Sequence, residues 1–213
     1  MAPRGAGRPS LHDHATRRAG RGPGAQHAWQ IHRPARGHRR NARVAESARR
    51  RFGHHRDLDR GRAPLSLVLD ASLALAWIFE RADPDERLLA DRVLDTLAEQ
   101  PVLVPALWHI EIANALLVAE RRMVVREAQV IDYMNRLSRL PIQTDDVPAA
   151  NRQEMVMALG RAHRLSAYDA TYLELALRTG SALASFDAKL LAATEAAGAA
   201  IVVAPAPDAG AQG

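Results

Sequence analysis

From residue 65 to residue 203, short apolar runs of strand length alternate with longer segments of helical character, and no other feature constrains the fold as much. Apolar periodicity and segment length predict strands at 65–70, 102–105, 141–144, 181–185 and 200–203. The same criteria predict helices at 71–79, 84–100, 107–122, 126–139, 147–163, 167–178 and 188–197. Strands that alternate with helices favour parallel pairing through helical crossovers. We therefore expect an α/β domain over residues 64–205 with a mostly parallel sheet of about five strands.

Residues 1–63 differ in composition from everything that follows them. Residues 1–62 hold 16 arginines, no lysine and 4 acids, whereas the rest of the chain holds 13 basic and 20 acidic residues, so the two parts carry net charges of +12 and −7. The first part is also rich in Gly, Ala, Pro and His and has no apolar periodicity, so it cannot bury enough apolar surface to offset its chain entropy. We expect residues 1–63 to be a disordered basic tail and residues 206–213 to be a disordered C-terminal end.

Three interpretations of the basic tail remain open from the sequence. It is a nucleic-acid-binding arm, a solvated tail without function, or a segment that does not belong to the natural product. Arg-rich, His-rich and Lys-free sequence is typical of a GC-rich upstream region translated in the wrong frame, and this composition favours the third interpretation.

Several classes of protein are excluded or disfavoured by what the chain lacks. Without cysteine it has no disulfide, thiolate metal site or thiol nucleophile, which is consistent with the reducing cytoplasm. It contains no run of 18 apolar residues and no apolar stretch typical of a secretory signal, so we expect a cytoplasmic protein that does not span a membrane. A dinucleotide-binding glycine motif is missing after the first strand. An aspartyl phosphotransferase would usually have a second Asp where this chain has Ser72.

Two aspartates follow predicted strands and are expected at one edge of the sheet. Asp70 closes the first strand and Asp187 follows the fourth. Ligands of parallel α/β sheets bind beyond the carboxyl ends of the strands, so both side chains should reach that crevice. Asp187 has an alternative role as N-cap of the next helix. At Asp70 a capping role is less favoured, because Ser72 could cap instead.

Glu111 interrupts an apolar face of a predicted helix. Positions 107, 110, 111, 114, 115 and 118 share one helical face and read Leu, Ile, Glu, Asn, Ala and Val. A buried carboxylate costs several kcal/mol unless it is paired or bound to metal. A salt bridge to an arginine is the structural alternative to a role in a site.

A fourth acid, Asp169, lies in the segment from Ser166 to Asp169, which matches a helix capping box. Capping and a site role are compatible, because the box places Asp169 in the first helical turn. Four acids at such positions, without cysteine or a well-placed histidine, are suited to a hard divalent cation such as Mg²⁺ or Mn²⁺. A bound cation relieves the repulsion between carboxylates and activates water for attack on phosphorus.

Four segments, in order along about 140 residues, resemble the signatures of PIN domains, and within them of the VapC-like toxins. They are Val68-Leu-Asp-Ala-Ser72, Val104-Pro-Ala-Leu-Trp-His-Ile-Glu-Ile-Ala-Asn114, Leu165-Ser-Ala-Tyr-Asp-Ala-Thr-Tyr172 and Ala184-Ser-Phe-Asp187.

The resemblance implies a three-layer α/β/α domain in which four acids surround one or two Mg²⁺ or Mn²⁺ ions. Asp70, Glu111 and Asp169 would hold the principal ion, and Asp187 would bind a second ion or orient water. Ser72 or Ser185 would supply a supporting hydroxyl, and Asn114 would be a partner of Glu111.

The function implied is metal-dependent hydrolysis of RNA by the toxin of a toxin–antitoxin pair, which forms a homodimer and is silenced by its cognate antitoxin. The alternative is a non-catalytic nucleic-acid-binding or partner-binding module with the same fold. An acidic domain needs local positive charge to hold RNA, and solvated helix faces are the competing interpretation of its exposed arginines. The candidates are Arg121, Arg122, Arg126, Arg161 and Arg164.

Overall fold

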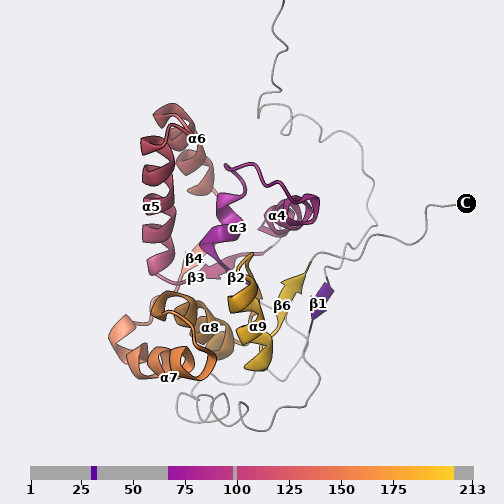
Figure 1. Cartoon of the computed structure of the whole chain (residues 1–213), viewed down its shortest axis with the longest axis vertical. Coiled ribbons are helices and arrows are strands. Elements are labelled where there is room, and N and C mark those ends of the chain that lie inside the picture. Colours follow the sequence, from indigo (N-terminus) through magenta and orange to yellow (C-terminus); the bar gives the residue numbers. More distant parts are fainter. Residues whose placement is uncertain (1–29, 33–66, 98–99, 204–213) are drawn as a thin grey trace, which may run out of the picture.

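A computed structural model describes residues 30–32, 67–97 and 100–203 (Figure 1). The strands are β1 (Gln30–His32), β2 (Leu67–Leu69), β3 (Val102–Val104), β4 (Ile142–Thr144), β5 (Ala182–Ala184) and β6 (Ile201–Val203). The helices are α3 (Ala71–Leu75), α4 (Pro84–Leu97), α5 (Leu107–Arg121), α6 (Glu127–Leu137), the 3₁₀ helix η1 (Ala149–Arg152), α7 (Gln153–His163), α8 (Ala167–Thr179) and α9 (Ala188–Ala196). Each predicted strand and helix is present, mostly with shorter bounds. The predicted helix over 71–79 is regular only to Leu75, and that over 147–163 begins as a 3₁₀ turn.

The strands form one sheet in the order β1-β6-β5-β2-β3-β4. The five strands from β2 to β6 are parallel, as the alternation of strands and helices predicts. Strand β1 adds an antiparallel edge, with Gln30 opposite Val203 and His32 opposite Ile201. This strand was not predicted, because residues 30–32 lie in the segment expected to be disordered. The rest of that segment, and the C-terminal end from residue 204, lie outside the described residues.

The chain order explains why the helices lie in two layers. From β2 the chain moves along the sheet to β3 and β4, and after returning to β5 it moves the opposite way to β6. Right-handed crossovers in opposite directions place their helices on opposite faces. Figure 1 accordingly shows α3 to α6 on one side of the sheet and α7 to α9 on the other. The result is the expected three-layer α/β/α fold.

The core is built from the strands and the inner faces of the helices. Trp108 of α5, Tyr172 of α8 and leucines of both layers are completely enclosed. Helix α8 contacts β2 and β5 and is flanked by α7 and α9, so it is the central helix of its layer. Its ends are set by the sequence, with Ser166 as N-cap and Gly180 in the left-handed conformation (φ 68°) that glycine adopts without strain.

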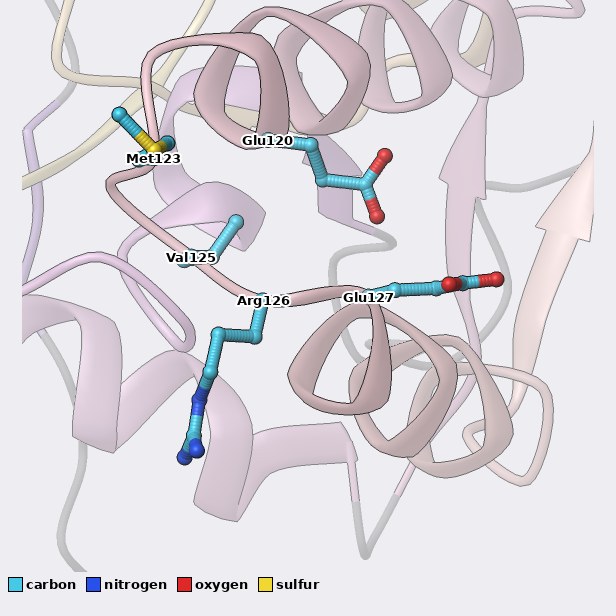
Figure 2. A pocket seen from close by; sticks show the side chains of 5 residues that line it. All are labelled: Glu120, Met123, Val125, Arg126 and Glu127. Atoms are coloured by element: carbon cyan, nitrogen blue, oxygen red, sulfur yellow. The ribbon is translucent and has the colours of Figure 1, made fainter.

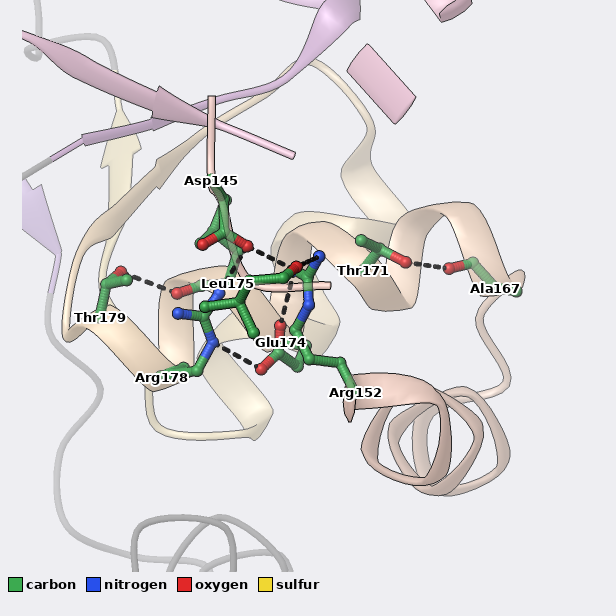
Figure 3. A network of polar contacts seen from close by, with 9 residues as sticks. Asp145, Arg152, Ala167, Thr171, Glu174, Leu175, Arg178 and Thr179 are labelled. Carbon is green, nitrogen blue, oxygen red and sulfur yellow. Dashed lines mark hydrogen bonds and ion pairs between the residues drawn. The ribbon is translucent and has the colours of Figure 1, made fainter. Parts of the chain in front are cut away.

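A buried network of charged side chains attaches the segment after β4 to α8 (Figure 3). Arg152 of η1 contacts Asp145 at 2.6 Å and Glu174 at 3.4 Å, and Arg178 contacts the same two acids at 2.8 and 2.9 Å. Arg152 also donates to the carbonyl oxygen of Val147 at 2.6 Å. The two positive and two negative charges balance one another and fix α8 against the edge of the sheet. Across the described part of the chain, none of the helices has the length and apolar character needed to cross a membrane.

Candidate active site

The candidate site lies where the connections of two neighbouring strands leave the sheet in opposite directions. Strand β2 leads to α3 on one face, and its neighbour β5 leads to α9 on the other. Such a switch point leaves a crevice beyond the carboxyl ends of the strands, which is where α/β sheets bind ligands. Asp70 follows β2 directly, and Ser185 follows β5. The strand pairing therefore brings together two residues that lie far apart in the sequence.

Two serine hydroxyls hold the buried carboxylate of Asp70. The Oδ2 atom of Asp70 accepts hydrogen bonds from Ser72 Oγ at 2.5 Å and from Ser185 Oγ at 2.6 Å. Burial raises the pKa of Asp70, whereas the two serines and the backbone N–H groups of Ala71 and Ser72 act against this rise. Both serines expected to support the site thus contact Asp70.

The same serines also bind the loop between β5 and α9. Ser72 Oγ accepts from the backbone N–H of Phe186 at 3.1 Å, and Ser185 Oγ accepts from that of Asp187 at 2.9 Å. Asp187 itself caps α9, since its Oδ1 accepts from the backbone N–H of Leu190 at 2.8 Å. Asp187 therefore takes its alternative role as an N-cap. Its side chain is exposed, and one residue separates it in the sequence from Ser185.

Glu111 lies on α5, in the helical layer opposite to that of α8. Its Oε2 accepts a short hydrogen bond from the hydroxyl of Tyr172, which α8 supplies. Burial is the largest influence on the pKa of Glu111 and raises it, Tyr172 lowers it, and the charges of Asp70 and Asp169 raise it further. Among the described residues, no arginine pairs with Glu111. A salt bridge, the structural alternative for Glu111, is thus not found within the described residues, where its partner is Tyr172.

The face of α5 that packs on the core is rotated from the predicted one. The residues that α5 buries are Trp108, Ile112, Leu116 and Ala119, whereas Ile110 is 72% exposed and Asn114 is also exposed. Helix α5 is apolar on several sides, so periodicity alone could not identify its inner face. Glu111 consequently lies half-buried at the edge of the core.

The expected pairing of Asn114 with Glu111 is corrected at the same time. No hydrogen bond joins the exposed side chain of Asn114 to Glu111 in the described part of the chain, and Tyr172 takes that place.

Asp169 lies in the first turn of α8, as the capping box predicts. Ser166 Oγ accepts from the backbone N–H of Asp169 at 3.1 Å, and its hydroxyl donates to the carboxylate of Asp169 at 2.7 Å. The charge of Asp169 acts on Glu111 and raises its pKa, which places the carboxylate within electrostatic reach of the site.

Residues 67–196 match the PIN domain, well over half of the chain. The chain belongs to the PIN domain family. Proteins with PIN domains are generally nucleases, which are hydrolases, and they usually use divalent metals.

Two solved structures resemble this PIN domain at low sequence identity. One is PAE2754 from Pyrobaculum aerophilum, with 23% identity, a TM-score of 0.48, and coverage of 67% of this chain and 87% of that one. The other is FitAcB from Neisseria gonorrhoeae, with 17% identity, a TM-score of 0.44, and coverage of 64% and 96%. No curated protein matches the sequence.

The donor set of this PIN domain fits a hydrated Mg²⁺ or Mn²⁺ ion. Within residues 30–32, 67–97 and 100–203, no three His, Asp or Glu side chains are gathered closely enough to hold an ion by themselves. Mg²⁺ usually takes one or two carboxylates from a protein and completes its shell with water and substrate phosphate. Asp70 and Glu111 supply two such oxygen donors, and burial raises the pKa of both, a cost to their charged forms that a bound cation would reduce.

A hollow at the turn after α5 belongs to another part of the molecule. It is formed at the turn between α5 and α6 by Glu120, Met123, Val125, Arg126 and Glu127 (Figure 2). The side chains of the two glutamates point to one side of the turn, and Arg126 points away from them. None of the candidate acids lines this hollow, so it is not part of the candidate site at the strand ends.

Sequence reasoning missed two residues near the site. Tyr172 was noticed only within a motif, although its position three residues after Asp169 places both on one side of α8. Arg81, between α3 and α4, lies over the ring of Phe186 at 4.7 Å and pairs with Glu86 at 2.7 Å. Because Phe186 separates Ser185 from Asp187, Arg81 lies beside the site, with its charge paired to Glu86. No sequence spacing links Arg81 to Phe186, so this contact required the structure.

Proposed function

We propose that this PIN domain is an endoribonuclease that hydrolyses RNA phosphodiester bonds with the help of bound Mg²⁺ or Mn²⁺. The proposal is carried by the kind of group that forms hydrogen bonds with the acids at the switch point. Asp70, Glu111 and Asp169 are bound by the hydroxyls of serines and a tyrosine. Among the described residues, no lysine or arginine forms an ion pair with any of these three acids. Hydroxyls orient a carboxylate without removing its charge, so the site keeps its attraction for a cation.

The roles of the residues follow from where they lie. Asp70 and Glu111 would hold the principal ion, with Asp169 adding negative charge at its edge. Asp187 would hold a second ion or orient the attacking water. When bound, the metal lowers the pKa of water and stabilises charge developing on the phosphate oxygens. Ser72 and Ser185 keep the carboxylate of Asp70 in one orientation. No protein nucleophile is required.

We also propose that the enzyme is the toxin of a toxin–antitoxin pair of the VapC-like type. This rests on the four motifs in the sequence, which support a homodimer acting in the cytoplasm and silenced by a cognate antitoxin. The acidic character of the residues after 62 implies that RNA needs local positive charge. Arg81 lies beside the site and is a further candidate for phosphate contact.

The experiment that tests nuclease activity compares the full chain with its Asp70→Asn variant on labelled RNA. Cleavage should require added Mg²⁺ or Mn²⁺, stop with a chelator, and fall at least about 100-fold in the variant, because a ligand charge is removed. An exposed acid of α4 provides the matched control, and Asp91→Asn should cleave like the parent. Metal-independent RNA binding without cleavage would instead identify a non-catalytic module.

The toxin role is tested separately by expression in cells. Growth should stop when the parent is produced and continue when Asp70→Asn is produced at the same level. Cleavage in vitro without growth arrest would leave the nuclease proposal standing and overturn the toxin proposal.

A further inference from the structure

Tyr172 connects the two helical layers at the candidate site. Its side chain is 1% exposed, and its hydroxyl crosses from α8 to the carboxylate of Glu111 on α5. The two residues are 61 positions apart in the sequence. A buried tyrosine hydroxyl needs a partner, but this partner is a charged group at the edge of the core, where water could have served. The position therefore calls for a more specific explanation than burial.

The tyrosine oxygen also lies close to the first strand end. The backbone N–H of Ala71, the residue after Asp70, is near enough to lower the pKa of both Tyr172 and Asp70. Burial raises the pKa of the Tyr172 phenol most, the hydrogen bond to Glu111 raises it next, and the charge of Asp70 raises it further. The hydroxyl thus contacts Glu111 and lies within electrostatic reach of Asp70, the two carboxylates that would share the metal ion.

Without Tyr172, nothing in the described structure would hold Glu111 toward Asp70. The Glu side chain has several rotatable bonds, it is only half-buried, and the charges of Asp70 and Asp169 repel it. A carboxylate in this situation gains by turning toward solvent. The hydroxyl of Tyr172 is a rigidly placed donor, because its ring is enclosed in the core.

We propose that Tyr172 is a positioning residue for the metal site, whose hydroxyl fixes Oε2 of Glu111 and so would hold this carboxylate in place to bind the ion. This inference rests on the proposed metal-dependent function and specifies how Glu111 takes part in it. Groups that orient metal ligands typically contribute 10–100-fold to metal affinity or activity. Tyr172 contacts the ligand and not the reacting atoms, so its effect should appear in metal binding first.

The test measures Mn²⁺ binding by calorimetry for the full-length parent, Tyr172→Phe and a matched control. The Phe variant keeps the ring and removes only the hydroxyl. Tyr133→Phe is the control, because Tyr133 is also buried and its hydroxyl donates to the carbonyl of Ala74 at 3.0 Å, away from the acids. We expect the Kd for Mn²⁺ to rise about 10–100-fold in Tyr172→Phe and to stay within twofold in Tyr133→Phe. RNA cleavage by Tyr172→Phe should recover when Mn²⁺ is raised in proportion.

A second measurement separates positioning from a purely structural role. In the Glu111→Gln background, adding Tyr172→Phe should change the Kd for Mn²⁺ by less than twofold, because the ligand that Tyr172 orients is already lost. A folded Tyr172→Phe with the Kd of the parent would overturn the inference and leave the nuclease proposal intact. A parent that binds Mn²⁺ without cleaving RNA would overturn the nuclease proposal while the Kd comparison still decides the role of Tyr172. A parent that binds no Mn²⁺ would overturn both.

Discussion

Replacing Glu111 by Gln is the perturbation for which a metal site and a structural ion pair predict opposite results. In the metal-free protein, burial and the charges of Asp70 and Asp169 disfavour the ionised carboxylate, and Tyr172 offsets only part of this cost, so the pKa is raised. A raised acid pKa means that the folded state binds the proton more tightly than the unfolded state. Stability is then lost as pH rises from the ordinary pKa of Glu through the folded one. Above the folded pKa the loss is complete, and removing the charge should recover it.

The magnitude follows from three contributions. Gln keeps the shape of Glu111, and its amide oxygen can still accept from Tyr172, but a neutral hydrogen bond is weaker than a charged one by about 1 kcal/mol. Relief of desolvation and of two repulsions returns about 1–2 kcal/mol, at the lower end because Glu111 is half-exposed and screened by solvent. The metal-free variant should therefore match the parent or exceed it by up to about 1 kcal/mol, which raises Tm by up to about 4 °C.

The assay is a set of melting curves at pH 7 for the parent, Glu111→Gln and a control, each with and without Mn²⁺. At an Mn²⁺ concentration about 100 times Kd, the parent gains about 2.7 kcal/mol by mass action. Its midpoint should then rise by roughly 8–10 °C, whereas that of Glu111→Gln should rise far less. Glu120→Gln on the same helix is the control and should keep the full rise.

One result would refute the interpretation of Glu111 as a metal ligand. A structural charge left without its partner costs about 3–5 kcal/mol. A Glu111→Gln protein that melts about 10 °C or more below the parent without metal, yet retains the full rise with Mn²⁺, would show that Glu111 holds the fold and does not hold the ion.

Three further predictions concern stability. Arg152→Met leaves Asp145 and Glu174 with only Arg178, so urea unfolding should show a loss of about 3–5 kcal/mol, and a loss below about 1 kcal/mol would mean that the network of Figure 3 contributes little. Ser166→Ala removes the N-cap of α8 and should cost about 1 kcal/mol in the same measurement, whereas an unchanged midpoint would count against the cap. Deleting residues 1–63 removes β1 but keeps the pairing of β6 with β5, so Tm should fall by less than about 4 °C, or about 1 kcal/mol, and a larger fall would make the N-terminal segment part of the fold.

The sequence predicted those parts of the site that depend on local rules. A strand end and a helix start are set by neighbouring residues, so Asp70, Asp169 and Asp187 could be placed before the structure was known. The capping roles of Ser166 and Asp187 followed in the same way. Parallel pairing then brought Asp70 to Ser185, because adjacent parallel strands end at one edge.

The parts that could not be predicted depend on how distant elements meet. The rotation of α5 about its axis is decided by packing, and this rotation determines that Ile110 and Asn114 face outward. The hydrogen bond from Tyr172 to Glu111 forms only where two helices from opposite layers come together, and sequence spacing does not determine that contact. Strand β1 is only three residues long, too short for its alternation to be recognised within a polar, Arg-rich segment, and its backbone pairing with β6 carries no signature in the sequence.

The contrast between two groups of acids shows how one chain separates structure from function. Asp145 and Glu174 are buried with arginines on both, so their charges are neutralised and do not attract a cation. Asp70 and Glu111 are bound by hydroxyl groups, which share hydrogen atoms but supply no positive charge. A buried carboxylate that is bound by hydroxyl groups raises the free energy of the metal-free fold, and a bound cation would lower it again. Relief of this desolvation and repulsion would add to the affinity of the site for Mg²⁺ or Mn²⁺.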